Sequence, residues 1–525
     1  MSALFFHSPA LIVAVPLLGA FVLMVVSSWG EKYRDRVFFG AVALAALFAL
    51  SLAARVLGEG PVSYVFGAAS RLDGIIPPDS GGIPVRIIFH VDGIGAMMLV
   101  VAALSSLAAS VYALRSEEMA TGQNYFFPLF LLLVAGVYGM AATGDIFNFF
   151  VFLEIASLAG AALTAYRIDK GLAAEAGLKY AAISTLGGLS FLLGVGILLA
   201  QHNVLNMAAL AKAIDASGFT RANAVAMALM AVPMAMKCGA VPMHHWVPDT
   251  YSRAPSPVSA FLLVSSQACL YGLFRVCFTL FGLSMNWATV GWGIVILAAL
   301  SMFIGVTMAI PQHDVKRLIS HHAVSQTGYM LLGAGVCLAV LGDPAKVASF
   351  GRVALAGSLF HMVNYALYNG LLFLGAGAVI FRTGKRDLND MGGLGHAMPW
   401  TMVCFGVGAL AIAGIPPMSG FSSKLALYES VFKFSPFLSI VAMVVSLLTL
   451  ASFVKVFQAM FLGPRRAAFA EVREVPWTLL APMAMLALAT IWIGVYPEVA
   501  MDRLLLPAAD ALIQRAAYLA PGGAM

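Results

Sequence analysis

The sequence of 525 residues predicts an all-α protein that crosses a lipid bilayer many times. Hydrophobic residues make up 61% of the chain and charged residues only 10%, and the mean hydropathy is +0.93. A soluble protein of this length could not cover its surface with so few charges. Runs of about 20 apolar residues, the length that a helix needs to cross the hydrocarbon core, recur along the whole chain and indicate about 14 spans.

The first part, 1–120, is predicted to hold three helices and one external loop. Its apolar runs lie at 4–27, 37–58 and 90–114. The first run lacks the basic stretch and the small-residue cleavage site of a secretory signal. We therefore expect a first spanning helix there.

The second part, 121–285, is predicted to hold five spans, one of them broken. Its apolar runs lie at 125–142, 146–166, 173–200, 222–246 and 256–281. Lys237 is followed by Pro242, and proline removes a backbone donor and clashes with the preceding turn, so we expect this helix to break. A short amphipathic segment near 204–216 is expected at the membrane surface.

The third part, 286–463, shows the same organisation, and 464–525 adds a last helix and a tail. Its runs lie at 287–310, 317–341, 353–381, 398–432 and 437–462, and the final run lies at 477–496. The 398–432 segment is too long for one straight helix and holds Pro416 and Pro417 before Lys424, which predicts a second broken span.

The spacing of the two breaks predicts an internal repeat. They lie in the seventh and twelfth spans, five apart, as expected if spans 4–8 and 9–13 are two copies of a five-helix unit. An odd number of spans in each unit makes successive units inverted in the membrane. Alternate loops, beginning with 28–36, carry more Lys and Arg than the loops between them, so the positive-inside rule places both termini outside.

Three charged residues lie in apolar segments, where a charge costs at least about 2.5–3.5 kcal/mol. Glu154 lies in IFNFFVFLEIASLAGAALTAY, Lys237 in VAMALMAVPMAMKCGAVPM, and Lys424 just after AIAGIPPMSGFSS. Such charges favour an ion or proton path through a membrane. A lysine whose carboxylate partner moves can gain and lose a proton, and Glu154 is the natural partner of Lys237. The alternative is a static ion pair that locks two helices together.

Three further basic residues lie within spans, where a structural role is the alternative to a place on the ion path. Lys455 lies about two turns from the end of its span, so its side chain could reach the interface. Arg275 could pack against a neighbouring carboxylate or at the outer interface. For Lys179 a place on the ion path and a structural place are both open.

Histidines could extend a proton route. His361 lies in mid-span in SLFHMVNYALYNGLLFLG, with Asn364, Tyr365 and Asn369 on nearby turns. Two histidine pairs lie near the expected cytoplasmic side as candidates for proton entry: His244, His245, His321 and His322. A packing role is the alternative for each of them.

The sequence shows no motif for metal, redox or nucleotide chemistry. Its five cysteines lie in apolar segments without a CxxC pair, and we find neither a Walker loop nor an HxxxH metal motif. We therefore expect no cofactor and no redox site in the chain itself.

Several motifs resemble those of the antiporter-like subunits of respiratory complex I, Mrp-type cation/proton antiporters and membrane-bound hydrogenases. The most distinctive is KCGAVPMHHWVPDTYSRAPSPVSAF, and GDIFNFFVFLEIAS, DVKRLISHHAVSQTGYMLLG, FHMVNYALYNGLLFLGAGAVI, GIPPMSGFSSK and FHVDGIGAMM resemble the others. They cover roughly 88–430. The resemblance implies a fold of fourteen helices with two inverted five-helix repeats.

The resemblance also implies roles for individual residues. Glu154 and Lys237 match the family's Glu–Lys pair, Lys424 matches the charged residue of the second broken helix, and His361 matches a central relay histidine. Two positions depart from the pattern: Gln267 and Asn369 stand where many members carry lysine. Amides can hold water but carry no proton charge, so transport at these positions is either water-dependent or lost.

The leading hypothesis is a subunit that translocates protons, or exchanges them for sodium, within a larger membrane complex driven by redox energy or a cation gradient. We expect other membrane subunits as partners, no nucleic acid, and the inner membrane of a prokaryote as the location. One alternative is a non-conducting scaffold subunit of such a complex, which Gln267 and Asn369 favour. Another is a stand-alone solute transporter.

Overall fold

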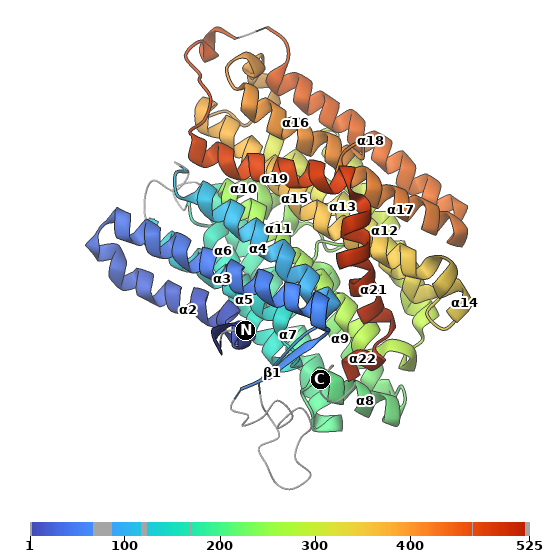
Figure 1. Ribbon diagram of the computed structural model, residues 1–525. Helices are drawn as coiled ribbons and strands as arrows, with labels where there is room; N and C mark the ends of the chain where they lie inside the picture. The colour runs from blue at the N-terminus through green and yellow to red at the C-terminus, as the bar shows by residue number, and fades with distance from the viewer. Residues whose placement is uncertain (1–2, 67–86, 117–122, 168–170, 465, 520–525) are drawn as a thin grey trace.

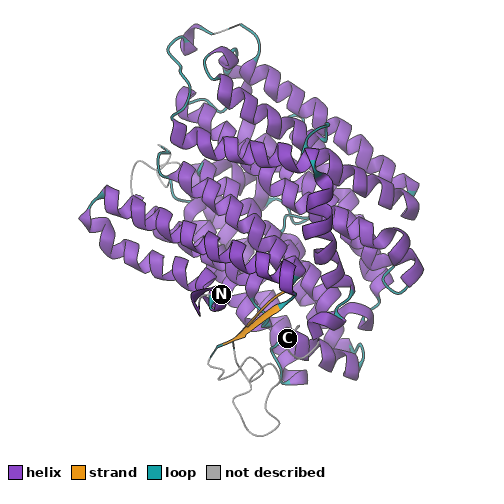
Figure 2. Ribbon diagram, viewed as in Figure 1, coloured by secondary structure: helices purple, strands orange, loops and turns teal. Residues whose placement is uncertain are grey.

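A computed structural model describes residues 3–66, 87–116, 123–167, 171–464 and 466–519, and its described elements are nearly all helices (Figures 1 and 2). Within these ranges, eleven helices are long and apolar enough to cross a membrane. The remaining predicted spans fall on α9 (Arg221–Lys237), α13 (Val315–Ala339) and the pair α16 (Pro399–Ala413) and α17 (Ser419–Phe434). The all-helical membrane fold is confirmed, whereas the count of fourteen spans stays a prediction.

The N-terminal part packs three long helices beside a small hairpin. After the short α1 (Ala3–Phe6) come α2 (Ser8–Val26), α3 (Glu31–Glu59) and α4 (Gly93–Ala113). Strands β1 (Val62–Val65) and β2 (Ile88–Val91) pair antiparallel, with Val62 opposite Val91. Much of the predicted external loop, 67–86, lies outside the described residues.

The second part contains the first broken helix. Its elements are α5 (Gln123–Ala142), α6 (Ile146–Thr164), α7 (Gly171–His202), α8 (Met207–Ser217), α9, α10 (Trp246–Arg253) and α11 (Ser256–Phe274), which continues into a π-helical stretch, Arg275–Phe281. The predicted surface segment is the amphipathic helix α8. Helix α9 ends at Lys237, and Pro242 lies in the gap before α10, so the first predicted break is confirmed.

The third part contains the second broken helix. It comprises α12 (Trp287–Ala309), α13, α14 (Pro344–Lys346), a π-helical turn (Val347–Gly351), α15 (Arg352–Thr383), α16, α17 and α18 (Pro436–Phe461). Pro416 and Pro417 lie between α16 and α17, and Gly414 turns the chain there with φ +79°. The second predicted break is therefore confirmed.

The C-terminal part is one long helix followed by short ones. These are α19 (Trp477–Val495), α20 (Pro497–Ala500), the π-helical turn Met501–Leu505, α21 (Leu506–Ile513) and α22 (Ala516–Leu519). The four predicted parts of the chain, divided near 120, 285 and 463, and the inversion of the two repeats remain predictions.

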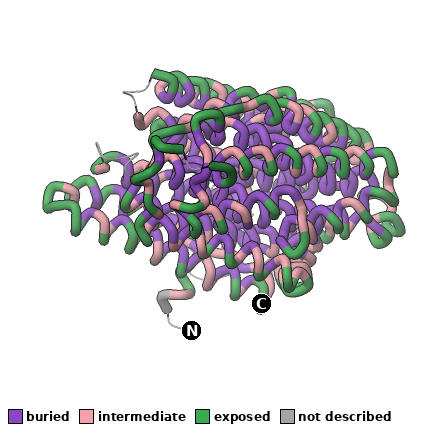
Figure 3. The backbone as a smooth tube through the Cα atoms, turned by 90° about the horizontal axis from the view of Figure 1, so that it is seen from above, coloured by how far each residue is buried: buried purple, intermediate pink, exposed green. Residues whose placement is uncertain are grey.

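Burial places two helices at the centre of the bundle. The most apolar 18-residue stretch of Ser256–Ser284 is 100% buried, and that of Pro344–Thr383 is 94% buried. The corresponding stretches of α7, α18 and α19 are only 39% buried, and these helices expose large apolar side chains. Figure 3 shows buried backbone through the middle of the bundle and exposed backbone around its edge. Helices α11 and α15 therefore form an interior that lipid does not reach, and most of the predicted site residues lie on them or on helices packed against them.

Candidate functional site: a row of buried polar groups

Lys237, the last residue of α9, forms a buried ion pair with Glu154 of α6. Its Nζ lies 3.5 Å from Oε1 of Glu154 and donates a hydrogen bond of 2.7 Å to Oγ of Ser157. The lysine side chain is 4% exposed and the glutamate side chain 23%. Taking two charges out of water is costly, and their attraction compensates for it only when further hydrogen bonds are present, as Ser157 provides here. The predicted pairing is confirmed.

Two glycines of α7 make room for this pair. A β-carbon on Gly188 would collide with Oε1 of Glu154, and one on Gly187 would lie 3.3 Å from Cε of Lys237. No side chain larger than hydrogen fits at Gly188 unless the carboxylate moves. The sequence LGGLSF holds this signal, but without coordinates it reads only as a close helix contact.

Lys424 of α17 is buried among neutral acceptors. Its Nζ donates to the backbone oxygen of Ile412 at 2.7 Å and to Oγ of Ser446 at 2.9 Å, and it lies 4.9 Å from the ring centroid of Tyr329. Ile412 lies at the C-terminal end of α16, where the helix dipole is negative. Among the residues that the structure describes, no carboxylate pairs with Lys424.

His361 of α15 connects to the second broken helix through Ser423, the residue before Lys424. Nδ1 of His361 lies 3.1 Å from Oγ of Ser423. Nε2 lies 3.1 Å from both Oε1 of Gln326 and the hydroxyl of Tyr368. Both ring nitrogens therefore have polar partners. Sequence reasoning did not single out these three residues, because their side chains are uncharged.

Gln267 of α11 connects that helix to α15, which carries His361. Its Nε2 donates to the backbone oxygen of Met362, the residue after His361, at 2.5 Å. Its own Oε1 is buried without a hydrogen-bond partner in the described part of the chain, as are both polar side-chain atoms of Asn369. Buried polar groups normally bind protein or ordered water, so these amides mark places suited to water. Five neighbouring helices, α6, α9, α11, α15 and α17, carry the members of what we call the buried polar row: Glu154, Lys237, Gln267, His361 and Lys424.

Three of the predicted entry histidines lie near one another, His244, His245 and His321, whereas His322 makes its contact elsewhere. His244 is buried and His245 exposed, with ring centroids 4.5 Å apart. His321 is buried, and neither of its ring nitrogens has a partner among the described residues. His322 points elsewhere, because its Nε2 lies 2.8 Å from Oγ of Ser452 in α18. Whether any of them admits protons stays a prediction.

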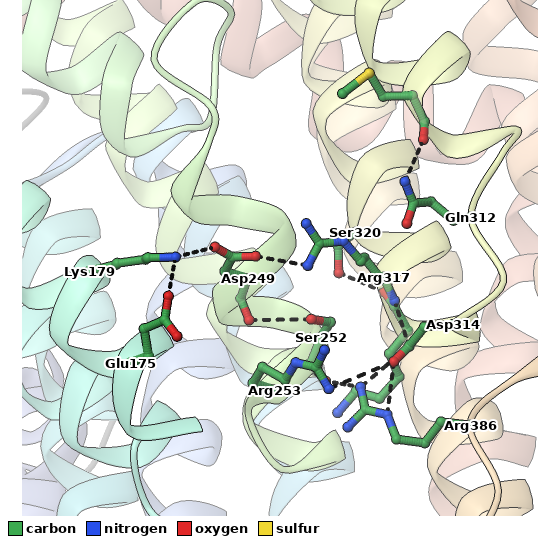
Figure 4. Close-up of polar contacts among 12 residues, drawn as sticks. Glu175, Lys179, Asp249, Ser252, Arg253, Gln312, Asp314, Arg317, Ser320 and Arg386 are labelled. Carbon is green, nitrogen blue, oxygen red and sulfur yellow. Dashed lines mark hydrogen bonds and ion pairs between the residues drawn. The ribbon is translucent and has the colours of Figure 1, made fainter. Parts of the chain in front are cut away.

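Lys179 lies outside the row, in a network of surface charges (Figure 4). Its side chain is 48% exposed, and Nζ pairs with Glu175 at 2.6 Å and with Oδ2 of Asp249 at 3.0 Å. The other oxygen of Asp249 accepts a hydrogen bond of 2.9 Å from Arg317. The structure therefore places Lys179 beside Asp249 and not beside the Glu154–Lys237 pair, and its part in an ion path stays a prediction.

The other two in-span basic residues have structural partners. Arg275 is buried in an ion pair with Asp92, the N-cap of α4, which is one of the two arrangements predicted for it. Lys455 donates to the backbone oxygens of Ile310 and Gln312 at 2.7 and 3.0 Å, just beyond the end of α12. In the described ranges no group of three or more His, Cys, Asp or Glu could hold a metal ion.

The surface network predicts a pH-dependent contribution to stability. Burial works to raise the pKa of Asp249, but the bonds and charges of Lys179 and Arg317 outweigh it, and the pKa lies below its ordinary value. The stabilisation is therefore present at neutral pH and disappears as the pH falls below about 3.9. We expect Asp249→Asn to lower stability at pH 7 by about 1 kcal/mol or less. Thermal unfolding of the wild type and the variant from pH 7 to pH 3 checks this expectation. A difference in stability between the two that stays constant with pH would contradict it.

Comparisons with known proteins identify the family of the chain. Residues 143–449 match the family model described as "NADH:quinone oxidoreductase/Mrp antiporter, TM". A membrane subunit of the NADH-quinone oxidoreductase of Desulforudis audaxviator is 33% identical over 94% of this chain and 96% of that protein. A subunit of the Na(+)/H(+) antiporter of Alkalihalophilus pseudofirmus is 32% identical over 79% and 81% of the two chains.

A solved structure shows the same fold. A chain in the structure of the Mrp complex from Dietzia superposes with a TM-score of 0.83 at 27% identity, and the match covers 99% of each chain. The matched family region contains both broken helices and every member of the buried polar row. The chain therefore belongs to the family of membrane subunits shared by NADH:quinone oxidoreductases and Mrp antiporters.

Proposed function

We propose that the chain is an ion-translocating subunit of a multi-subunit membrane complex, which moves protons or exchanges them for sodium. The observation that carries this proposal is the Glu154–Lys237 ion pair at the end of a broken helix, at one end of a buried row of polar groups. Relatives named as quinone oxidoreductase and antiporter subunits support it. The partners would be other membrane subunits, in the inner membrane of a prokaryote with both termini outside.

The proposed mechanism couples protonation to the making and breaking of the ion pair. While Lys237 is protonated, it is held by Glu154 and Ser157. When the carboxylate moves away or is protonated, the lysine charge loses its main compensation and its proton can leave toward α11. Gln267 and Asn369 would carry this proton only through bound water, since neither amide changes its charge.

The second half of the route would run from His361 to Lys424. The imidazole contacts Ser423 on one side and Gln326 and Tyr368 on the other, so either nitrogen can exchange a proton with a neighbour. Lys424 would receive the proton beside the negative end of α16. The hydrogen bond of Gln267 to Met362 ties α11 to the same turn of α15 and so connects the two halves.

The experiment that tests the proposal is a flux measurement on the reconstituted complex that contains this chain. Driven proton and sodium movements are compared between wild type, Glu154→Gln and the control Glu429→Gln, an exposed carboxylate on α17. We expect Glu154→Gln to lower the flux at least about tenfold, which corresponds to about 1.4 kcal/mol in the barrier. We expect the control to be unchanged.

An intact complex with unaltered flux in Glu154→Gln would overturn the proposal. It would favour the scaffold hypothesis instead, for which Gln267 and Asn369 are the supporting positions.

A further inference from the structure

A groove of about 760 Å³ lies between α16 and α18, and no member of the buried polar row lines it. Gly406 and Leu410 of α16 form one wall, and Leu450, Val454 and Phe457 of α18 form the other. Helix α18 lies at the edge of the bundle (Figure 1). Leu410 is 41% exposed and Val454 55% exposed, so the groove opens on the apolar outer face.

The shape of the groove follows from small residues on α16. A β-carbon on Gly406 would lie 3.2 Å from Cε2 of Phe457, so the glycine lets the phenyl ring lie against the helix backbone. The part of α18 that lines the groove runs from Leu450 to Ala459, which is about 14 Å at 1.5 Å per residue. One leaflet of a bilayer has a hydrocarbon thickness of about 15 Å. The groove therefore matches the reach of one acyl chain.

Two cations line the groove, Lys455 midway along the lining part of α18 and Arg466 just beyond the end of that helix. Lys455 uses two of its three donors for Ile310 and Gln312, and Arg466 donates to the backbone oxygen of Asn389 at 2.6 Å. All these acceptors are neutral, and neither cation has a carboxylate partner in the part of the chain that is described. Two positive charges in the lining of an apolar groove thus lack a carboxylate partner among the described residues.

We propose that this groove binds an anionic phospholipid, with an acyl chain between α16 and α18 and its phosphate at Lys455 and Arg466. Basic pockets between membrane helices bind anionic headgroups, and phosphate oxygens form strong charge-assisted bonds with Lys and Arg. A transmembrane helix fits less well. An apolar helix brings no negative charge to Lys455 and Arg466, whereas the phosphate of a lipid does.

Photo-crosslinking locates the lipid. The purified complex is incubated with phosphatidylglycerol that carries a photoreactive group in one acyl chain, or with phosphatidylcholine of the same chains, and labelled peptides are mapped. We expect label from phosphatidylglycerol on α16 and α18 around the groove and much less from phosphatidylcholine. Arg466→Gln should lower the label about fivefold, the factor for loss of one surface cation.

Two matched pairs of variants test the binding of the headgroup and of the acyl chain separately. Arg36→Gln removes an exposed cation elsewhere and is the control for Arg466→Gln. Val454→Trp fills the groove from an exposed position, and Val444→Trp places the same residue at an exposed position of α18 that does not line it. Only Arg466→Gln and Val454→Trp should lower labelling.

The proposal is overturned by any of three results. The first is equal labelling by the two lipids, which indicates bulk lipid. The second is labelling that the variants do not change. The third is no label in the wild-type complex, which indicates that a partner subunit covers the groove. None of these outcomes depends on ion transport, so a failed flux measurement would leave this proposal intact.

Discussion

Lys237→Met should abolish driven ion flux and also destabilise the protein. The exchange removes the ammonium that faces Glu154 and leaves the carboxylate largely buried without a counter-charge. Breaking a buried pair from one side costs up to about 3–5 kcal/mol. The flux should fall at least about tenfold, since the group that exchanges its proton at the helix break is gone. Flux in proteoliposomes and the midpoint of thermal unfolding measure the two effects.

A double variant separates transport from stability. In Glu154→Gln with Lys237→Met no unpaired charge remains, so we expect the thermal midpoint to recover toward wild type while the flux stays low. Lys212→Met, at an exposed position of α8, is the control for the loss of a lysine and should change neither. Recovery of flux together with stability in the double variant would show that the pair is a static lock between α6 and α9.

Lys424→Met should lower the flux as strongly but leave the protein more stable than Lys237→Met. The acceptors of Lys424 are a backbone oxygen of Ile412 and the hydroxyl of Ser446. Both are neutral, so the exchange leaves no charge unpaired among the described residues, and burial of an ammonium is avoided. The same flux assay and thermal midpoint check this expectation.

The control for this exchange lies on the same helix. Lys433 of α17 is exposed, and Lys433→Met should leave both flux and midpoint unchanged. If Lys424→Met instead lost more stability than Lys237→Met, the lysine would be a structural anchor of the second broken helix. Its place in the proposed route would then be wrong.

The helix breaks were predictable because proline acts locally. A proline at 242 clashes with the carbonyl of residue 238, and α9 ends at Lys237, one residue earlier. The partner of Lys237 was also predictable, since Glu154 was the only acid clearly in mid-span. Both inferences depended on residues that are costly in hydrocarbon and therefore rare.

The neutral members of the site were not predictable in the same way. Ser157, Gln326, Ser423 and Ser446 are uncharged, and residues of these types recur throughout the apolar segments. Their roles follow from which helices lie side by side, which the hydropathy pattern does not specify. Lys179 illustrates the same limitation. Its position within an apolar run left a place on the ion path and a structural place both open, and only the structure shows that its side chain is 48% exposed.

The bare backbone of Gly188 makes α7 the element that permits the ion pair. A single methyl group on residue 188 would occupy the position of the Glu154 carboxylate and force it to move. Consecutive residues of a helix point about 100° apart, so a turn of α7 about its axis would bring Leu189, now 56% exposed to the outside, toward the position of Glu154. Such a rotation of one outer helix would open or close the charge pair without any change at the charged residues themselves.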